Sequence, residues 1–288
     1  TSWYENPRGK GSEGHWTRHK VFDKTDNESP TFSDLLGTGK PVLICSTGGK
    51  MGYALPDYAA PEKPWTFHPI SPKKGYQRFT HGLGFGDVNA DGRNDILVHD
   101  GWYEQPAKLD GDPEWVFHKA DFGPGGAQMH VYDVNGDGRP DVITSLEAHG
   151  FGLAWFEQKG DGSFEKHLIV GSKASENPQG VEFSQPHAVD LIDINGDGLK
   201  DIVTGKRFWA HTTDVEANAP AVLYWFELKR GPDHKVQWIA HLIDNDSGVG
   251  TQVIAKDINH DKRPAIVVGN KKGTFVFIQQ PEKAAAAK

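Results

Sequence analysis

The stretch Asp87-Val88-Asn89-Ala90-Asp91-Gly92-Arg93-Asn94-Asp95-Ile96-Leu97 decides the fold, because the chain repeats it. Two further copies, at residues 133–143 and 193–203, keep the aspartates, the asparagine and the glycine. A copy at residues 257–267 is degenerate, and a faint one begins at Asp34. The first aspartates of neighbouring copies lie 46 to 64 residues apart, which is the length of a four-stranded blade with variable loops.

Two kinds of aromatic segment recur along the chain together with this motif. The first is a short strand, found as Trp3-Tyr4-Glu5, Trp102-Tyr103-Glu104, Trp155-Phe156-Glu157, Trp225-Phe226-Glu227 and, less faithfully, Phe275-Val276-Phe277. The second is a strand that ends in an aromatic residue and a histidine three positions later, at Trp16/His19, Trp65/His68, Trp115/His118, Phe164/His167 and Trp238/His241. Five of the 14 histidines therefore belong to the repeat rather than to a site.

With the strands of a blade named A to D, the chain reads as C-D, then four complete blades, then A-B-C. The sequence thus predicts an all-β protein, a β-propeller of four-stranded antiparallel blades with five to six visible, as one domain over residues 1–288. We expect the N-terminal strands to complete the C-terminal blade and remove its free edge. The opening at Thr1 in the middle of a repeat is compatible with a missing upstream part. The segments between the expected strands are rich in turn residues, and their apolar residues do not recur every 3.6 positions. The sequence therefore predicts few helices.

Composition excludes several classes of protein. The net charge of -8 and the pI near 5.9 argue against a nucleic-acid partner, which usually requires a basic stripe. No apolar run approaches the roughly 20 residues of a membrane span, so we expect no membrane insertion. The single cysteine, Cys45, excludes an intrachain disulfide framework and lies in an apolar strand, where a buried, unreactive thiol is expected.

The motif itself has the spacing of a calcium loop. Oxygen-bearing side chains occupy positions 1, 3, 5 and 9, with glycine at position 6 where the chain turns, as in the first part of an EF-hand loop. A polar hairpin without metal is the alternative. Lys262 and Ala265 replace the turn glycine and the last ligand in the fourth copy, so weak or no binding is expected there, and the Asp34 copy lacks the ligands. The predicted ligands of about three structural Ca²⁺ ions are Asp87, Asn89, Asp91, Asp95, Asp133, Asn135, Asp137, Asp141, Asp193, Asn195, Asp197 and Asp201.

Calcium in a structural role favours an extracellular or periplasmic location, where the ion is plentiful. The motif loops connect strands A and B, so strand alternation places the D-A and B-C loops on the opposite face. Remaining histidines gather in those segments, and we predict a shared polar pocket there. For each histidine the alternative is a structural residue of a loop or of the core, whose imidazole is hydrogen-bonded within the protein. The candidate catalytic residues are His81, His130, His149, His187, Lys206, Arg207 and His211.

Two or three imidazoles with a carboxylate are also suitable ligands for Zn²⁺, although no local signature such as His-x-x-x-His is present. Lys206 and Arg207 are suited to binding a carboxylate or stabilising an enolate, unless they are only solvated charges.

Four segments carry a resemblance to known proteins: residues 81–89, 101–104, 129–133 and 148–155. Through them the chain resembles FG-GAP/VCBS-type repeat propellers over essentially its whole length. More narrowly, it resembles the propeller domain of aldos-2-ulose dehydratase (1,5-anhydrofructose dehydratase). That resemblance implies seven blades, zinc in the propeller cleft and elimination of water from a keto-sugar. This chain shows fewer blades and no cupin or lectin domain.

The resemblance implies that Zn²⁺ polarises the keto oxygen while a histidine removes the proton α to it. It makes His81, His130, His149 and His187 the candidates for metal ligand and base. The leading functional prediction is a carbohydrate-active lyase or dehydratase, with a sugar or oligosaccharide as partner. One alternative is a non-catalytic propeller that binds a glycan or a protein. The other is a polysaccharide lyase in which Lys206 and Arg207 neutralise a uronate.

Overall fold

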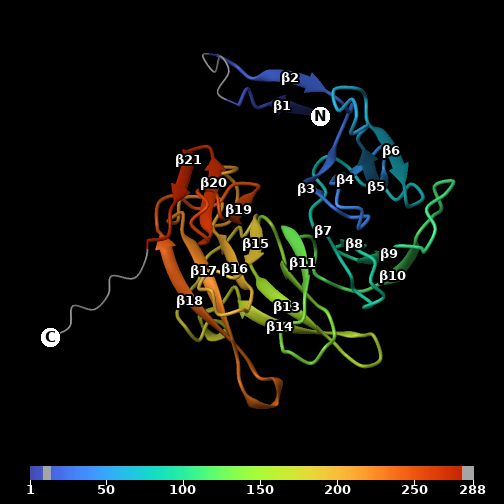
Figure 1. The fold of residues 1–288 in the computed structure, drawn as a ribbon. Coiled ribbons are helices and arrows are strands. Elements are labelled where there is room, and N and C mark those ends of the chain that lie inside the picture. The colour runs from blue at the N-terminus through green and yellow to red at the C-terminus, as the bar shows by residue number, and fades with distance from the viewer. Residues whose placement is uncertain (9–13, 281–288) are drawn as a thin grey trace. The chain divides into compact units, whose positions relative to one another are not determined.

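The computed structural model describes residues 1–8 and 14–280, and the chain divides into two compact units, Thr1–Phe122 and Gly123–Lys288 (Figure 1). Both units consist of antiparallel sheets, which confirms the all-β prediction. In the described ranges the helices are two short 3₁₀ turns, Ala174–Glu176 and Pro232–His234. No helix of this part of the chain has the length and apolar character that crossing a membrane requires.

Unit 1 holds a two-stranded sheet followed by two runs of four strands. The pair is β1 (Ser2–Glu5) and β2 (Thr17–Lys20). The first run is β3 (Asp26–Ser33), β4 (Val42–Thr47), β5 (Lys50–Leu55) and β6 (Thr66–Pro69). The second run is β7 (Leu83–Gly86), β8 (Asp95–Val98), β9 (Gly101–Glu104) and β10 (Val116–Lys119).

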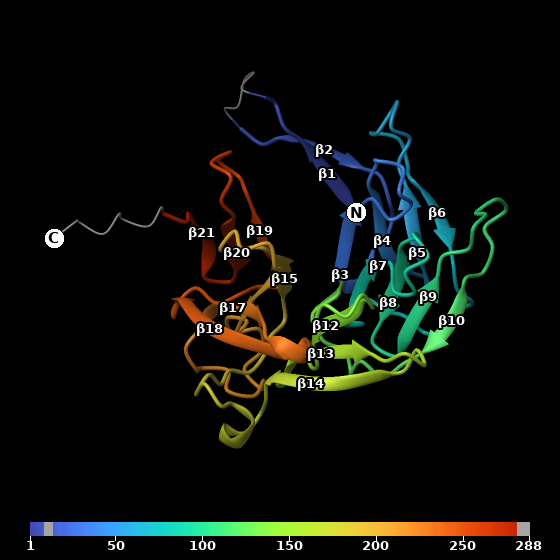
Figure 2. The same cartoon turned by 60° about the horizontal axis from the view of Figure 1, so that its bottom comes forward.

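Unit 2 continues with two runs of four strands and one of three (Figure 2). The first is β11 (Gln128–Tyr132), β12 (Asp141–Ser145), β13 (Leu153–Gln158) and β14 (Phe164–Val170). The second is β15 (Val189–Ile192), β16 (Asp201–Gly205), β17 (Leu223–Arg230) and β18 (Val236–Asp244). The last is β19 (Val253–Lys256), β20 (Ala265–Asn270) and β21 (Gly273–Phe277).

The strand order within each unit follows the predicted C-D, A-B-C-D and A-B-C runs. Second strands of the runs form the interior: every residue of β8, β12 and β16 is buried. Their Val, Ile and Leu side chains suit a strand covered on both faces. Cys45 in β4 is also fully buried, and this burial raises the pKa of its thiol to about 12, in line with the predicted unreactive cysteine. The blade count, closure of the ring and a single domain over residues 1–288 stay predictions.

The aromatic residue of each third strand lies directly opposite the histidine of the fourth strand. The ring centroids are 4.4 Å apart for Trp3/His19, 5.0 Å for Tyr53/His68, 4.1 Å for Trp102/His118, 4.4 Å for Trp155/His167 and 4.2 Å for Trp225/His241. In four of these pairs the imidazole Nε2 also bonds the glutamate two residues after the aromatic, at 2.7 to 3.1 Å. The five repeat histidines are therefore structural, as their position in the repeat predicted.

Candidate functional site

The motif loops connect β7 to β8, β11 to β12 and β15 to β16, the first and second strands of a run. In the first loop, Asp87 accepts hydrogen bonds from the amides of Asp91 and Gly92, at 3.0 and 2.8 Å. Asn89 accepts a second bond from the Asp91 amide, at 3.1 Å. The loops at Asp133 and Asp193 repeat these contacts. The loop therefore wraps around its own acidic side chains, with Gly92 at a φ of 85° where the chain reverses.

The last aspartate of each motif is fully buried and joins the loop to the third strand of the run. Asp95 accepts bonds from the amides of Val88 and Gln105, both at 2.9 Å. Asp141 and Asp201 make the corresponding pairs of bonds. Burial raises the pKa of all three carboxyls to about 6, and the neighbouring loop aspartates add to this rise. Each loop thus concentrates carboxylates around one desolvated carboxyl.

The degenerate copies keep the turn without the buried acid. Asp257 accepts bonds from the amides of Asp261 and Lys262, at 3.1 and 2.9 Å, and Lys262 adopts a φ of 68° in place of glycine. Asp34 likewise bonds the amides of two following residues, at 3.0 and 2.7 Å. The shape of the turn is therefore common to all copies, and the last aspartate separates the three complete loops from the others.

A side-chain cluster lies in unit 2, on loops at the other ends of these strands. We call His149, His187, Arg207, His211 and Asp214 the histidine cluster. Nη2 of Arg207 is 2.8 Å from Nδ1 of His149 and 3.5 Å from a carboxylate oxygen of Asp214. The His149 ring lies 5.4 Å from the ring of His187, edge to face, and 5.4 Å from the ring of His211, stacked at 15°. The cluster thus gathers three imidazoles around one ion pair.

Gln185 fixes the loops that present the cluster. This residue is fully buried and has a positive φ of 57°. Its amide donates to the carbonyl of Gly150 at 2.6 Å, and its own carbonyl accepts from the amide of Arg207 at 2.9 Å. Its side-chain Nε2 donates to the carbonyl of Val215 at 2.8 Å. One residue therefore bonds the loop that carries His149 and both ends of the segment from Arg207 to Val215.

Lys206 is buried beside this cluster. The residue is 1% exposed, and its Nζ has no hydrogen-bond partner among the described residues. Burial lowers the pKa of its amine, whereas the carboxylates of Glu216 and Asp214 act in the opposite direction. Its neighbour Arg207 keeps a charge at any accessible pH, so Arg207 is the permanent cation of the cluster.

The remaining two predicted site residues are His130 and His81. His130 is on β11, where its Nε2 donates to the carbonyl of Val189 at 3.0 Å, and burial lowers the pKa of its imidazole. It is not part of the histidine cluster. His81 belongs to unit 1, where its Nε2 lies 3.5 Å from a carboxylate oxygen of Glu28. Of the seven predicted residues, the structure of unit 2 brings together His149, His187, Arg207 and His211, with Lys206 adjacent in the chain.

Sequence reasoning missed Asp214 and Gln185. Asp214 is in the long connection between β16 and β17, residues 206–222, whereas β12 and β13 are joined by residues 146–152 only. The greater length of that connection was the available signal. Gln185 precedes Pro186 in an irregular segment and carries no pattern of its own.

The histidine cluster offers donor atoms that suit zinc, but a positively charged guanidinium lies next to them. Ligand atoms of His149, His211 and Asp214 lie within 4.8 Å of one another, which fits the donor types of a zinc site. The Arg207 guanidinium, however, contacts both His149 and Asp214 and would repel a second cation at the same atoms. The cluster as arranged therefore does not fit zinc.

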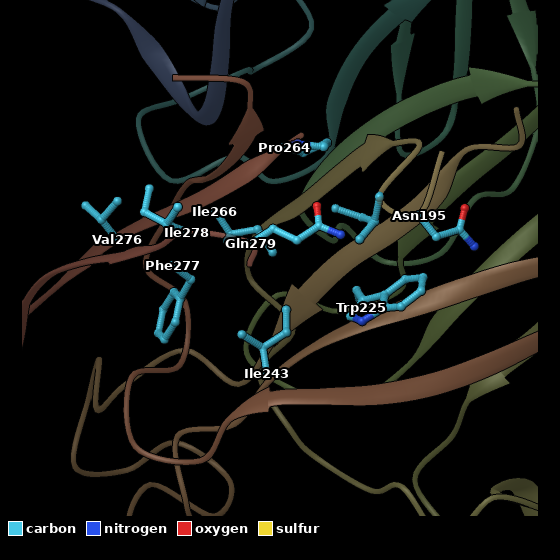
Figure 3. Close-up of a pocket in the computed structure, with 10 residues that line it drawn as sticks. Asn195, Trp225, Ile243, Pro264, Ile266, Val276, Phe277, Ile278 and Gln279 are labelled. Carbon is cyan, nitrogen blue, oxygen red and sulfur yellow. The ribbon is translucent and has the colours of Figure 1, made fainter. Parts of the chain in front are cut away.

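A pocket of about 430 Å³ elsewhere in unit 2 is mainly apolar (Figure 3). Trp225, Ile243, Ile266 and Phe277 line it, and its polar contributions come from Asn195 and Gln279. Because none of its lining residues is titratable, it is not a candidate for acid-base chemistry.

Comparisons with known proteins find one matching family model and similar solved structures. The family model described as an FG-GAP-like repeat matches residues 133–204. A lectin from Agrocybe aegerita, reported with the structural basis of specific recognition of non-reducing terminal N-acetylglucosamine, is similar in structure with a TM-score of 0.55 and 16% identity. The alignment covers 91% of this chain and 67% of the lectin. The repeat match and the antiparallel sheets fit a propeller-type domain of the FG-GAP kind.

A second structure, the V. cholerae biofilm matrix protein Bap1, aligns over 84% of this chain and 66% of its own with a TM-score of 0.32 and 12% identity, which is too low to inform the fold. No curated protein matches this sequence.

Proposed function

We propose that the protein binds carbohydrate through the histidine cluster of unit 2. The observation that carries the proposal is the contact between Arg207 and His149, which holds a nearly buried guanidinium against an imidazole whose side chain is 30% exposed. Guanidinium and imidazole groups donate and accept hydrogen bonds in fixed directions, which is how polar sugar hydroxyls and carboxylates are recognised.

An aromatic surface belongs to the same connection. Trp209 is 40% exposed, and Nζ of Lys271 lies 5.1 Å from the centre of its ring and bonds the carbonyl of Ala210 at 2.7 Å. An exposed indole of this kind packs against the apolar face of a sugar ring, while its edge stays in water. The similar fold of the Agrocybe aegerita lectin is compatible with this proposal but names no ligand for this chain.

The test is a glycan array followed by titration calorimetry with the best ligand. Arg207→Met should lower affinity about tenfold or more, because a charged hydrogen bond to the ligand is lost. Trp209→Ala should weaken the same ligand. Arg78→Met, a matched change at an exposed arginine of unit 1, should have no effect. Unchanged affinity in Arg207→Met would place carbohydrate binding elsewhere.

A second candidate is elimination of water from a keto-sugar such as 1,5-anhydrofructose. It is favoured by the stacking of an exposed His211 on His149, because His211 can accept a proton while Arg207 engages Nδ1 of His149. The imidazole would take the proton α to the carbonyl, the C–H electrons would form the double bond, and the β-hydroxyl would leave as water after protonation. The Arg207 charge would stabilise the enolate, which is also the role that a uronate-cleaving lyase would require.

Ultraviolet absorbance of the enone formed from 1,5-anhydrofructose tests this candidate. Activity that disappears in His211→Gln but leaves ligand affinity intact would support elimination. Binding without absorbance change would leave the protein as a glycan-binding module.

The three complete motif loops are proposed to hold structural calcium, one ion each. Each loop offers oxygen donors at four positions, and one of them belongs to a buried carboxyl. Such a set of oxygen ligands favours a hard divalent ion. Arginines already contact the position-5 aspartates in two loops, Arg93 with Asp91 and Arg139 with Asp137, so the ion must compete with them. Calcium of this kind would suit an extracellular or periplasmic protein.

A further inference from the structure

A polar pocket of about 340 Å³ lies in unit 1. It is formed by the connection between β6 and β7 and by the tight turn between β8 and β9, which strand alternation places at the opposite ends of the strands from the motif loops. Its lining residues are Lys74, Gly75, Tyr76, Thr80, His99 and Asp100. Its volume is at the small end of the range for ligand sites, which suits one sugar ring.

The pocket contains two opposite charges that do not pair. Oδ1 of Asp100 is buried and has no hydrogen-bond partner among the described residues. Nζ of Lys74 lies over two aromatic rings instead, 3.4 Å from the centre of Phe117 and 5.0 Å from the centre of Tyr103. A desolvated carboxylate oxygen without a donor costs free energy. The pocket thus offers one carboxylate and one ammonium group that could contact a ligand.

The walls of the pocket are fixed by backbone hydrogen bonds. The carbonyls of His99 and Asp100 accept bonds from the amides of Phe122 and Ala120, at 3.0 and 3.1 Å. The amide of Lys74 donates to the carbonyl of Gly49 at 2.8 Å. Tyr76 shares a 2.8 Å hydrogen bond with the hydroxyl of Tyr103. Such bonds keep the lining groups in place before a ligand arrives, which lowers the entropy cost of binding.

We propose that this pocket is a second carbohydrate site and that it takes a hexuronate unit. A ring hydroxyl donates to the carboxylate of Asp100, and the uronate carboxylate meets the ammonium of Lys74. The hydroxyl of Thr80 and the imidazole of His99 supply further hydrogen bonds to the ring. This site goes beyond the function proposed for unit 2 and does not depend on it.

Isothermal titration with sodium D-glucuronate, D-glucose and L-serine tests the proposal. Glucuronate should bind about tenfold or more tightly than glucose, because glucose lacks the group that pairs with Lys74. Lys74→Met should abolish that preference, whereas Lys73→Met, the same change at the adjacent exposed lysine, should keep it. Asp100→Asn should weaken both sugars, since its amide offers one acceptor fewer.

Three results would overturn the proposal. The first is equal affinity for glucuronate and glucose, or none for either. The second is tighter binding of L-serine than of glucuronate, which would indicate an amino-acid site. The third is loss of the glucuronate preference in Arg207→Met with no change in Lys74→Met, which would assign the ligand to the histidine cluster. Lys74 is exposed, so its variant should fold, and urea unfolding verifies this.

Discussion

Nη2 of Arg207 lies 2.8 Å from Nδ1 of His149, and because a guanidinium only donates, the imidazole accepts a charged hydrogen bond. The same Nη2 is 3.5 Å from Asp214. One guanidinium therefore orients a base and a carboxylate together. The ammonium of lysine is a point charge on a flexible stem and does not present donors in a plane.

Arg207→Lys should consequently behave as a loss of function rather than as a conservative change. We expect ligand affinity to fall about tenfold, with the free energy of unfolding changed by less than about 1 kcal/mol. Titration calorimetry and urea unfolding measure the two quantities. If Arg207→Lys kept the affinity of the parent protein, the planar set of N–H donors on the guanidinium would not be needed for binding.

The repeat could be predicted from sequence because its residues act on near neighbours. Trp225 and His241 are partners in adjacent antiparallel strands, so an aromatic segment and a spaced histidine were enough to find them. Asp214 reaches His149 from a different connection, 65 residues away, at 3.4 Å. No local period encodes such a contact. It depends on the positive φ of Gln185, which holds the two loops together and which its side-chain type does not indicate.

Calcium removal should destabilise the protein through the three complete loops. Binding of an ion at a concentration 100 times its dissociation constant contributes about 2.7 kcal/mol per site, so excess EDTA should lower Tm by several degrees. Elemental analysis of Asp193→Asn should find one calcium fewer per chain than in the parent protein. Asp257→Asn makes the matched change in the degenerate loop, where Asp257 bonds the same pair of amides, and should leave the calcium content unchanged. Equal loss from both variants would contradict the assignment of ligands.

Acid should destabilise unit 2 through His130. Burial lowers the pKa of this imidazole in the folded state, and the nearby Asp190 only partly offsets this. As the pH falls below the unfolded value of about 6.5, the unfolded chain binds a proton that the folded chain does not, so the free energy of unfolding decreases. His130→Gln should flatten this dependence between pH 7 and pH 5. His260→Gln, at an exposed loop position, is the control, and its slope should match that of the parent protein.

The stacked pair of Trp102 and His118 offers a test of how the repeat stabilises each run of strands. The rings are 4.1 Å apart, and Nε2 of His118 bonds Glu104 at 2.7 Å. His118→Ala removes both contacts and should lower the free energy of unfolding by about 1 kcal/mol. Glu104→Gln keeps the stack and replaces a charged acceptor by a neutral one, so it should cost less than half as much if ring packing is the larger contribution. Urea unfolding monitored by tryptophan fluorescence compares the two variants, and a loss in Glu104→Gln equal to that in His118→Ala would assign the stabilisation to the hydrogen bond instead.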